Sequence, residues 1–433
     1  MNNIFLEETG KLPHENFSLE NNEFINYIFE NSILFDFFDI FASIVYTDFY
    51  TPRKETSLTK KIRLEIPVVH FDKIFPLQQK INDLVRYMTS GENWDITIVK
   101  YNSTKKIEFE YDKIKLNMYN SCALFSAGMD SFCGAYNEVL NQNKTVFVTF
   151  QSNDLEKSKA EKIFRECFQR DNNAWTSFDR VFLDRQKNYT ERTRTLLFLT
   201  FGIIVASTNE IEKLNIYENG IMSLNPTFDF SRKVSKTTHP RVIYLMNSIL
   251  KKLEINVKID NPFIYKTKGQ ILNTLPHEMK NMILKTKTCS KSMANRHFAM
   301  RRKGQFHCGV CIACILRQIS EVNANIQIKE YEYLVPLSLK SKEECRVHFT
   351  KLTNKSINKI NTPEYWFNEK ISLLAYYKKF REHIISKTIY NYIDISDEIY
   401  GDSDYLKKVD DMLNTFALEI SNYMRKVYDQ KNC

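Results

Sequence analysis

The sequence lacks a hydrophobic run long enough to cross a bilayer. Its longest apolar run, 196–206, is interrupted only by Thr200 and Gly202 and falls short of the roughly 20 apolar residues that a membrane helix needs. Glycine and proline are also scarce, with 10 of each in 433 residues, and 43% of the residues are hydrophobic. This composition argues against a disordered chain and predicts a well-packed globular protein, with 196–206 in a buried helix.

The N-terminus lacks the basic and apolar segments of a secretory signal, so we expect a cytoplasmic protein that does not engage a membrane.

The sequence also lacks a long run of residues with the same charge. The 61 Lys and Arg exceed the 52 Asp and Glu by nine, yet no run of five basic residues occurs. Such an excess would suit nucleotide or RNA, but it is also common in soluble proteins. Nucleic-acid binding is therefore compatible with the sequence and not favoured.

Three regions follow from the length and from changes of pattern along the chain. Residues 1–117 show strand-like alternation at 62–66, 94–98 and 107–111 and helical spacing at 75–88, which predicts an α+β domain of unknown role. Residues 118–330 alternate strands with helices. Residues 331–433 predict a helical extension, because apolar residues from Leu406 to Val427 step by three and four. A tail packed on the main domain is the favoured interpretation, and a partner-binding helix is the alternative.

The central region predicts an α/β fold with a parallel sheet and helices on both faces. Its helices are expected from 129 through 139, at 155–170 and at 192–208. Its strands are expected at 122–125, 145–150, 181–183, 214–217, 220–224 and 257–259. The run 145–150 is continuously β-branched and aromatic, which is typical of a strand covered on both faces.

The segment 124–131 predicts a strand, a tight turn and a helix, a phosphate-binding arrangement. Small residues at 126–128 let backbone N–H groups close on an anion, and Ser131 near the helix start adds the helix dipole. An acid beside a phosphate repels it unless a divalent cation lies between, so Asp130 is assigned to Mg²⁺. An ordinary capped helix is the alternative. The predicted nucleotide-binding residues are Ser126, Ala127, Gly128, Met129, Asp130, Ser131 and, at the end of the second strand, Phe150.

The nine cysteines form an odd set in a chain without a secretory signal, which argues against a disulfide framework. The spacing of Cys289, Cys308, Cys311 and Cys314 supplies the four thiolates of a structural zinc site. Basic residues at 291, 296, 301, 302 and 317 would favour thiolates over thiols, and His297 or His307 could replace one ligand. Buried or redox cysteines are the alternative. A site with four protein ligands has no open position, so it would fold a substrate-covering segment rather than catalyse.

The loop 126–131 resembles the SGGxDS signature of PP-loop ATP pyrophosphatases, with Ala127 in place of the first glycine. This resemblance implies an adenine nucleotide alpha hydrolase-like fold and an activity that splits ATP into pyrophosphate and an AMP left on a carboxyl or carbonyl oxygen. A PP-loop followed by C…CGxCxxCxxR, which here ends at Arg317, is similar to 7-cyano-7-deazaguanine synthase. That enzyme converts 7-carboxy-7-deazaguanine into the nitrile with ATP and ammonia. The similarity covers about 120–320.

The synthase has neither the 117-residue leader nor the helical tail. A longer chain of this kind resembles the QueC-like component of anti-phage operons of the Qat type. That resemblance implies that the deazaguanine acid is activated and passed to the amino terminus of a partner protein from the same operon. The alternatives are an ammonia-using synthase, a PP-loop tRNA-modifying enzyme, and a degenerate nucleotide-binding scaffold, for which Ala127 and Thr195 are the evidence.

The resemblance also implies further site residues. Arg194, which heads the apolar helix, resembles the family's Arg-Asn, and Thr267-Lys268 after 261–263 resembles its Thr-Lys segment. Arg194 and Lys268 would therefore join Asp130 and Ser131 in stabilising phosphate or transition-state charge. The segment 238–241 loosely matches the substrate segment, which makes His239 and Arg241 substrate contacts. We expect an AMP-forming ligase that uses ATP, Mg²⁺ and Zn²⁺.

Overall fold

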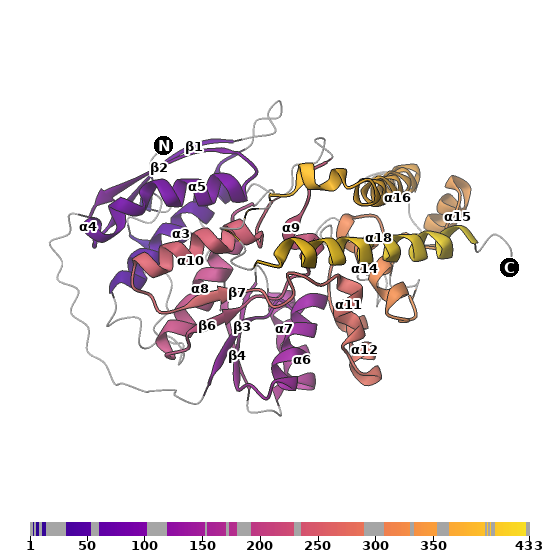
Figure 1. The fold of residues 1–433 in the computed structure, drawn as a ribbon, viewed down its shortest axis with the longest axis horizontal. Helices are drawn as coiled ribbons and strands as arrows, with labels where there is room; N and C mark the ends of the chain where they lie inside the picture. The colour runs from indigo at the N-terminus through magenta and orange to yellow at the C-terminus, as the bar shows by residue number, and fades with distance from the viewer. Residues whose placement is uncertain are drawn as a thin grey trace.

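The computed structural model shows a mixed α/β protein with a central sheet between an N-terminal region and a C-terminal helical region (Figure 1). The residues that it describes are 3, 6–7, 11–13, 32–52, 60–101, 119–151, 154–169, 173–179, 192–228, 235–289, 307–329, 333–352, 363–394, 396, 399 and 403–429. Within these ranges, no helix is both long and apolar enough to cross a membrane.

The central sheet has five parallel strands, as the alternation of strands and helices predicted. The strands are β3 (Ser121–Leu124), β4 (Thr145–Gln151), β5 (Ala174–Asp179), β6 (Lys213–Asn215) and β7 (Lys258–Asp260), and their spatial order is β5-β4-β3-β6-β7. The chain thus winds outward from β3 in both directions. In such a sheet a crevice opens beyond the carboxyl ends of the strands where the winding reverses, here between β3 and β6.

Helices cover both faces of the sheet because successive side chains of each strand point to opposite sides. Cys122 and Leu124 of β3 pack in one apolar core with α8 (Arg194–Thr208) and α10 (Pro240–Lys252). Ala123 and Phe125 pack in a second core with α6 (Met129–Leu140) and α7 (Asp154–Cys167). The run 196–206 lies in α8, where ten residues are buried, as its apolar composition predicted.

Some predicted strands differ from the structure. The candidates at 107–111 and 181–183 lie outside the described residues. The candidate at 220–224 is wrong, because this segment is a short helix, α9 (Gly220–Leu224). Its ends explain why: the Asn219 side chain accepts a hydrogen bond from the Met222 amide at the start, and Asn225 adopts a left-handed conformation with φ of 39° at the end. These caps outweigh the apolar composition of a segment only five residues long.

The N-terminal region combines α3 (Ser32–Tyr50), α4 (Phe71–Ile74), the 3₁₀ turn η3 (Phe75–Leu77) and α5 (Gln78–Met88) with a two-stranded parallel sheet of β1 (Lys61–Val68) and β2 (Asn93–Lys100). This agrees with the α+β pattern at 62–66, 75–88 and 94–98. Its apolar core is continuous with that of the central sheet, since Phe38 of α3 meets Phe201 of α8 with ring centroids 5.5 Å apart.

A buried aspartate of α3 also holds the start of α8. Asp48 Oδ2 accepts hydrogen bonds from the backbone amides of Arg192 and Thr193, at 2.9 and 3.1 Å, and from the Thr193 hydroxyl at 2.9 Å. Its Oδ1 pairs with Lys60 Nζ at 2.7 Å, and both side chains are almost fully buried. Asp48 therefore fixes the two residues that lead into α8, whose own N-cap residue makes no side-chain cap.

After the sheet, the chain continues through α11 (Lys268–Asn273), α12 (His277–Met282), η5 (Ile283–Lys285), α14 (Ile312–Asn323), α15 (Lys342–Leu352), α16 (Pro363–Ile385), η7 (Thr388–Tyr392) and α18 (Tyr405–Asp429). The apolar stripe of α18 is buried against α14 and α16, with Val409, Phe416 and Ile420 essentially inaccessible. The extension is thus a tail packed on the main domain, as the favoured interpretation predicted.

Replacing Asp48 with Asn should lower the free energy of unfolding of the whole chain by about 3–5 kcal/mol, because it leaves the Lys60 ammonium buried without a counter-charge. Denaturant unfolding followed by circular dichroism measures this change. Asp95→Asn is the matched control, since the Arg63–Asp95 pair is largely exposed and should contribute less than about 1 kcal/mol. Equal effects of the two substitutions would contradict the role of Asp48.

Candidate functional site

The loops that follow β3, β6 and β7 meet at the carboxyl edge of the sheet around a cavity of about 210 Å³. The α14 helix and the segment before Cys289 close its other side. The cavity is lined by Ser126, Gly128, Met129, Asp130, Ser131, Tyr217, Glu218, Met222, Lys268, Lys287, Thr288, Ala313 and Leu316. It lies beside the β3–β6 reversal, where parallel sheets of this kind bind ligands. Most of the predicted nucleotide-binding residues are therefore together in one hollow.

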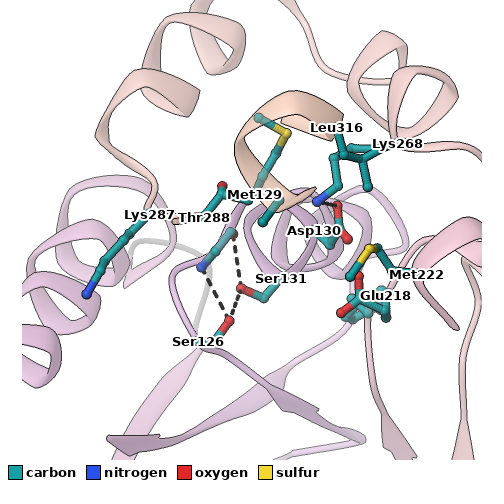
Figure 2. A pocket seen from close by; sticks show the side chains of 13 residues that line it. Ser126, Met129, Asp130, Ser131, Glu218, Met222, Lys268, Lys287, Thr288 and Leu316 are labelled. Carbon is teal, nitrogen blue, oxygen red and sulfur yellow. Dashed lines mark hydrogen bonds and ion pairs between the residues drawn. The ribbon is translucent and has the colours of Figure 1, made fainter. Parts of the chain in front are cut away.

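The loop 126–131 forms a compact turn with hydroxyl groups around a helix start (Figure 2). The Ser126 hydroxyl accepts a hydrogen bond from the Gly128 amide at 3.3 Å and lies 3.2 Å from the Ser131 hydroxyl. Gly128 is the N-cap of α6, and its side-chain position offers no acceptor. The first amides of a helix have no partner within the helix, so those of α6 are available to an anion in the cavity.

Ala127 adopts the left-handed conformation that glycine favours, with φ of 54°. An L-residue with a Cβ atom is strained there by roughly 1–2 kcal/mol. The turn nevertheless forms, and the Ala127 carbonyl accepts a hydrogen bond from the Lys287 amide at 3.2 Å. The loop therefore has a glycine-type backbone at an alanine, and it is tied to the segment that leads to Cys289.

Asp130 lies at the centre of a buried polar cluster. Its Oδ1 is 2.9 Å from Lys268 Nζ, and the two side chains point toward one another (Figure 2). Its Oδ2 accepts hydrogen bonds from the Asn219 side chain at 2.8 Å and from the Asn219 amide at 3.3 Å. Burial alone would raise the pKa of Asp130, but the Lys268 charge and hydrogen bonds from Glu218 and Asn219 hold it below its ordinary value. Asp130 is thus an anion at neutral pH.

Glu218 is the second carboxyl group of this cluster. It shares a hydrogen bond with Asp130, and its Oε1 accepts one from the Asn219 side chain at 3.0 Å. Burial, followed by the charge of Asp130, raises the pKa of Glu218 well above its ordinary value. Glu218 therefore holds the proton of the hydrogen bond that it shares with Asp130, and the Lys268 ammonium balances the charge of Asp130.

Asn261 fixes the loop that carries Glu218. Its side chain donates to the Glu218 carbonyl at 2.9 Å and to the Ser223 hydroxyl at 3.1 Å. The Gly220 amide donates to the Lys266 carbonyl at 2.9 Å, which joins the loops after β6 and β7 directly. Glu218 and Lys268 consequently belong to one rigid edge, and neither needs a large rearrangement to reach a ligand in the cavity.

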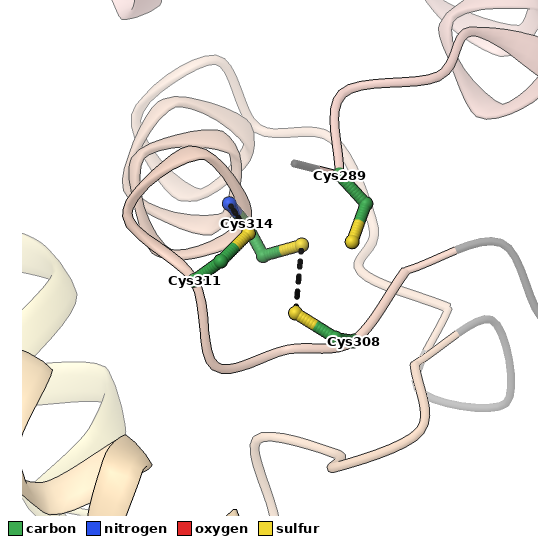
Figure 3. A group of neighbouring side chains, drawn as sticks. All are labelled: Cys289, Cys308, Cys311 and Cys314. Carbon is green, nitrogen blue, oxygen red and sulfur yellow. Dashed lines mark hydrogen bonds between the residues drawn. The ribbon is translucent and has the colours of Figure 1, made fainter. Parts of the chain in front are cut away.

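The four predicted metal ligands are brought together as well. The sulfur atoms of Cys289, Cys308, Cys311 and Cys314 all lie within 4.8 Å of one another, and the four residues are buried. Cys289 comes from one segment, whereas the other three come from the turn that opens α14 (Figure 3). Gly309 in that turn has φ of 78°, and a Cβ there would lie 2.2 Å from the Val335 carbonyl oxygen. The group could hold a metal ion such as zinc.

Arg317 connects the four-cysteine group to the cavity, although Arg317 is not itself a cavity-lining residue. The Arg317 side chain is fully buried, pairs with Glu321 at 2.7 Å and donates to the carbonyl oxygens of Ile283 and Thr286 at 2.8 and 3.0 Å. It thereby fixes the segment that continues through Lys287 and Thr288 to Cys289. The basic residues predicted at 291, 296, 301 and 302, and His297, lie outside the described residues.

His307 is not part of the four-cysteine group. Its ring lies 5.2 Å from the Tyr333 ring, centroid to centroid, and is buried. Burial, together with the charge of Arg317, lowers the pKa of His307 well below its ordinary value, so the ring is neutral.

Phe150 and Arg194 do not reach the cavity. Phe150 is buried in the core against Phe201, with ring centroids 5.3 Å apart, so its ring is not offered to a nucleotide. Arg194 begins α8 directly after the two residues that Asp48 holds, and it is not among the cavity-lining residues. For these two residues the structure indicates positions in the core and at a helix start.

His239 and Arg241 lie at a junction of three chain regions rather than in the cavity. His239 is fully buried, caps α10 by accepting from the Arg241 amide at 3.1 Å, and contacts the Tyr87 hydroxyl at 3.2 Å. Burial, then the charge of Lys236, lowers the pKa of His239 to about 3. Arg241 pairs with Asp394 at 2.9 Å, and its guanidinium lies 5.0 Å from the Tyr87 ring centroid. Both residues are engaged by protein groups.

The sequence analysis missed Glu218, Asn219 and Lys287. Glu218 stands in a short Tyr-Glu-Asn-Gly stretch that reads as a turn, and 88 positions separate it from Asp130. A usable signal did exist: Glu218 and Asn219 come soon after the short strand β6, Asp130 comes soon after β3, and the carboxyl ends of parallel strands share an edge. Lys287 does not follow a strand, so its place beside the cavity had no comparable signal in the sequence.

Ala127→Gly should raise the free energy of unfolding by up to about 1 kcal/mol, because glycine relieves the left-handed strain and loses part of that gain to chain entropy. Ala135→Gly, the same change within α6, should lower it by about 1 kcal/mol. Thermal or denaturant unfolding measures both. If the two substitutions destabilise the protein equally, Ala127 is not strained.

Purified protein should contain about one tightly bound metal ion per chain, measured by elemental analysis, because four buried thiol groups this close form a tetrahedral donor set. Cys311→Ser should remove most of the metal and lower the melting temperature. Cys345→Ser is the matched control, since Cys345 is buried in α15 but is not part of the four-cysteine group. Retention of the metal in Cys311→Ser would contradict the site.

No family model matches the chain, and no curated protein matches it. The functional proposal accordingly depends on the cavity, the cysteine group and the motifs of the chain.

Proposed function

We propose that the chain is a PP-loop, AMP-forming ligase that adenylates 7-carboxy-7-deazaguanine or a close analogue and transfers the activated acid to an amine. The observation that carries this proposal is the convergence of the loop 126–131 with the Asp130, Glu218 and Lys268 cluster at the reversal point of a parallel sheet. This combination suits a phosphate chain. Amide donors and cations bind the phosphate oxygens, and the acids can hold a divalent ion that lies between them and the phosphate.

The cavity suits the phosphate end of ATP. Its volume of about 210 Å³ is below the roughly 300–1,000 Å³ typical of sites that enclose a whole drug-sized ligand. The hydroxyl groups of Ser126 and Ser131 and the first amides of α6 face this space. Lys268 and Lys287 line it from two other segments. We therefore assign the pyrophosphate to this cavity and place the rest of the nucleotide beyond it.

Asp130 and Glu218 would hold Mg²⁺. Two carboxyl groups that share a proton in a buried cluster offer the oxygen donors that this ion prefers, and Asp130 Oδ1 has no hydrogen-bond partner among the described residues apart from its ion pair with Lys268. When bound, the ion neutralises charge on the phosphate oxygens. Glu218 would lose its proton on binding, and Lys268 would be released from Asp130 toward the phosphates.

The reaction then proceeds in two balanced steps. An oxygen of the substrate carboxylate attacks the α-phosphorus of ATP, the bond to the bridging oxygen breaks, and pyrophosphate leaves with the electron pair. In the second step an amine nitrogen attacks the acyl carbon, the bond from that carbon to the AMP oxygen breaks, AMP leaves with the electron pair, and the amine releases a proton to solvent. The protein contributes positioning and charge stabilisation, since neither step needs a covalent enzyme intermediate. Lys268 and the α6 amides would stabilise the charge that develops on pyrophosphate.

Zinc is the metal that we assign to the four cysteines, with a structural role. Four thiolates complete a tetrahedral shell and leave no open position for substrate. The site fixes α14, whose Ala313 and Leu316 line the cavity, and the segment carrying Lys287 and Thr288. It would thus maintain the wall opposite the loop 126–131.

The acceptor that we propose is the amino terminus of a partner protein from the same operon, in anti-phage defence. The resemblance to QueC-like chains of the Qat type supports this choice over ammonia. The absence of a basic run in the sequence weighs against tRNA as the acceptor.

Purified protein should release pyrophosphate from ATP in a manner that depends on 7-carboxy-7-deazaguanine. Asp130→Asn should slow this release by about a hundredfold or more, because it removes a charge that the phosphate site requires for its cation. A coupled pyrophosphate assay measures the rate. Asp72→Asn, an exposed acid at the start of α4, is the control and should match wild type.

Release from Asp130→Asn at the wild-type rate would contradict the site assignment. The acceptor is tested separately by incubating candidate partner proteins with the enzyme, ATP and the acid and measuring intact masses. A mass increase confined to a partner's amino-terminal peptide is expected. Conversion of the acid with ammonia alone, without any protein adduct, would instead identify a nitrile or amide synthase.

A further inference from the structure

The C-terminal helix α18 crosses both loops that carry the polar residues of the cavity. Met412 packs against Gly220, where an added Cβ would lie 2.2 Å from Met412 Sδ. Two turns later, Glu419 packs against Gly269, where an added Cβ would lie 2.3 Å from Glu419 Oε1. One face of α18 therefore contacts the loop after β6, which carries Glu218, and the loop after β7, which carries Lys268.

Glu419 is an unusual residue for this position. Its neighbours on the buried face of α18 are apolar, among them Phe416 and Ile420, and Glu419 itself is only 5% exposed. Its Oε2 has no hydrogen-bond partner among the described residues, and burial raises the pKa of Glu419 to about 7. A buried ionisable group is costly unless its polar atoms are used. Packing alone would be served better by an apolar side chain.

The other carboxylate oxygen of Glu419, Oε1, does have a partner: it accepts a hydrogen bond from the Thr267 hydroxyl at 2.6 Å. Thr267 is the N-cap of α11, and the same hydroxyl accepts from the Gln270 amide at 3.0 Å in a complete capping box. Lys268 is the next residue and the first of the helix. Because Glu419 engages the hydroxyl's proton, the oxygen lone pairs stay directed at the Gln270 amide, which fixes the first turn of α11.

We propose that Glu419 is a positioning residue that holds Lys268 against Asp130 through the Thr267 hydroxyl, so that the C-terminal helix completes the cavity. The effect of this contact on catalysis rests on the proposed function, whereas the placement of Lys268 does not. The structure thereby assigns the helical extension a direct part in the site in addition to its packing role.

Competitive labelling of lysines with an amine reagent, quantified by peptide mass spectrometry on the full chain, tests the placement without an activity assay. Glu419→Leu keeps the volume and removes the acceptor, so labelling of Lys268 should become at least fivefold faster. Glu419→Gln keeps an acceptor oxygen and should restore slow labelling. Lys258, an exposed lysine on β7, serves as the internal reference. Leu418→Ala, an exposed neighbour on α18, is the matched control.

Should Glu419→Leu fail to fold, Glu419→Asp replaces it, because the shortened side chain keeps the charge and withdraws from Thr267. Slow labelling of Lys268 in the folded Leu or Asp variant would overturn the proposal. Fast labelling in the Gln variant would overturn it too, since Gln retains the acceptor.

Pyrophosphate release then separates this inference from the proposed function. Glu419→Leu should lower kcat about tenfold, with KM for ATP changed less than threefold and with rescue by Glu419→Gln. An unchanged kcat in Glu419→Leu would overturn the catalytic part of the proposal. A wild-type protein that releases no pyrophosphate, but whose Lys268 labelling responds to Glu419 as expected, would refute the proposed function and leave the positioning role supported.

Discussion

The buried ion pair between Asp130 and Lys268 is the contact on which the site depends. It joins the start of α6, after β3, to the start of α11, after β7, across the intervening strand β6. Charges buried this deeply are retained only when their remaining hydrogen-bonding capacity is used, and Asn219 and Glu218 provide those partners. The surrounding loops, capped helices and cysteine group all serve to keep these few atoms together at one edge of the sheet.

Local patterns in the sequence were sufficient for the parts of the site that lie close together along the chain. The turn 126–131 follows a buried strand directly, and Cys308, Cys311 and Cys314 have metal-ligand spacing, so both were predicted and both are compact in the structure. The order of strands and helices likewise predicted the parallel sheet. In each case the information needed lies within a few residues, where hydrogen bonding and side-chain size decide the conformation.

Contacts between distant segments could not be predicted in this way. Glu218 stands after a strand of only three residues, so its position at the carboxyl edge of the sheet is a weak signal, and the local sequence does not show that its side chain meets Asp130. The end of a predicted strand suggested Phe150, and the resemblance suggested Arg194, His239 and Arg241, but neither kind of pattern shows which way a side chain points. The packing of Phe201 on Phe150 and the pairing of Asp394 with Arg241 are contacts between residues that lie far apart in the sequence, so local patterns do not reveal them. The strand expected at 220–224 failed for a local reason, the two asparagine caps.

The contact of Asp48 with the segment that leads into α8 has a consequence for how the molecule assembles. The acceptor and the amides that it binds are 144 and 145 positions apart in the chain. During synthesis α3 emerges long before α8, and until then Asp48 lacks the amides of Arg192 and Thr193 and the face of α3 that packs on α8 is uncovered. The first hundred residues should consequently tend to aggregate on their own. A chaperone that shields α3 would be expected to bind nascent chains and to leave once α8 has been made.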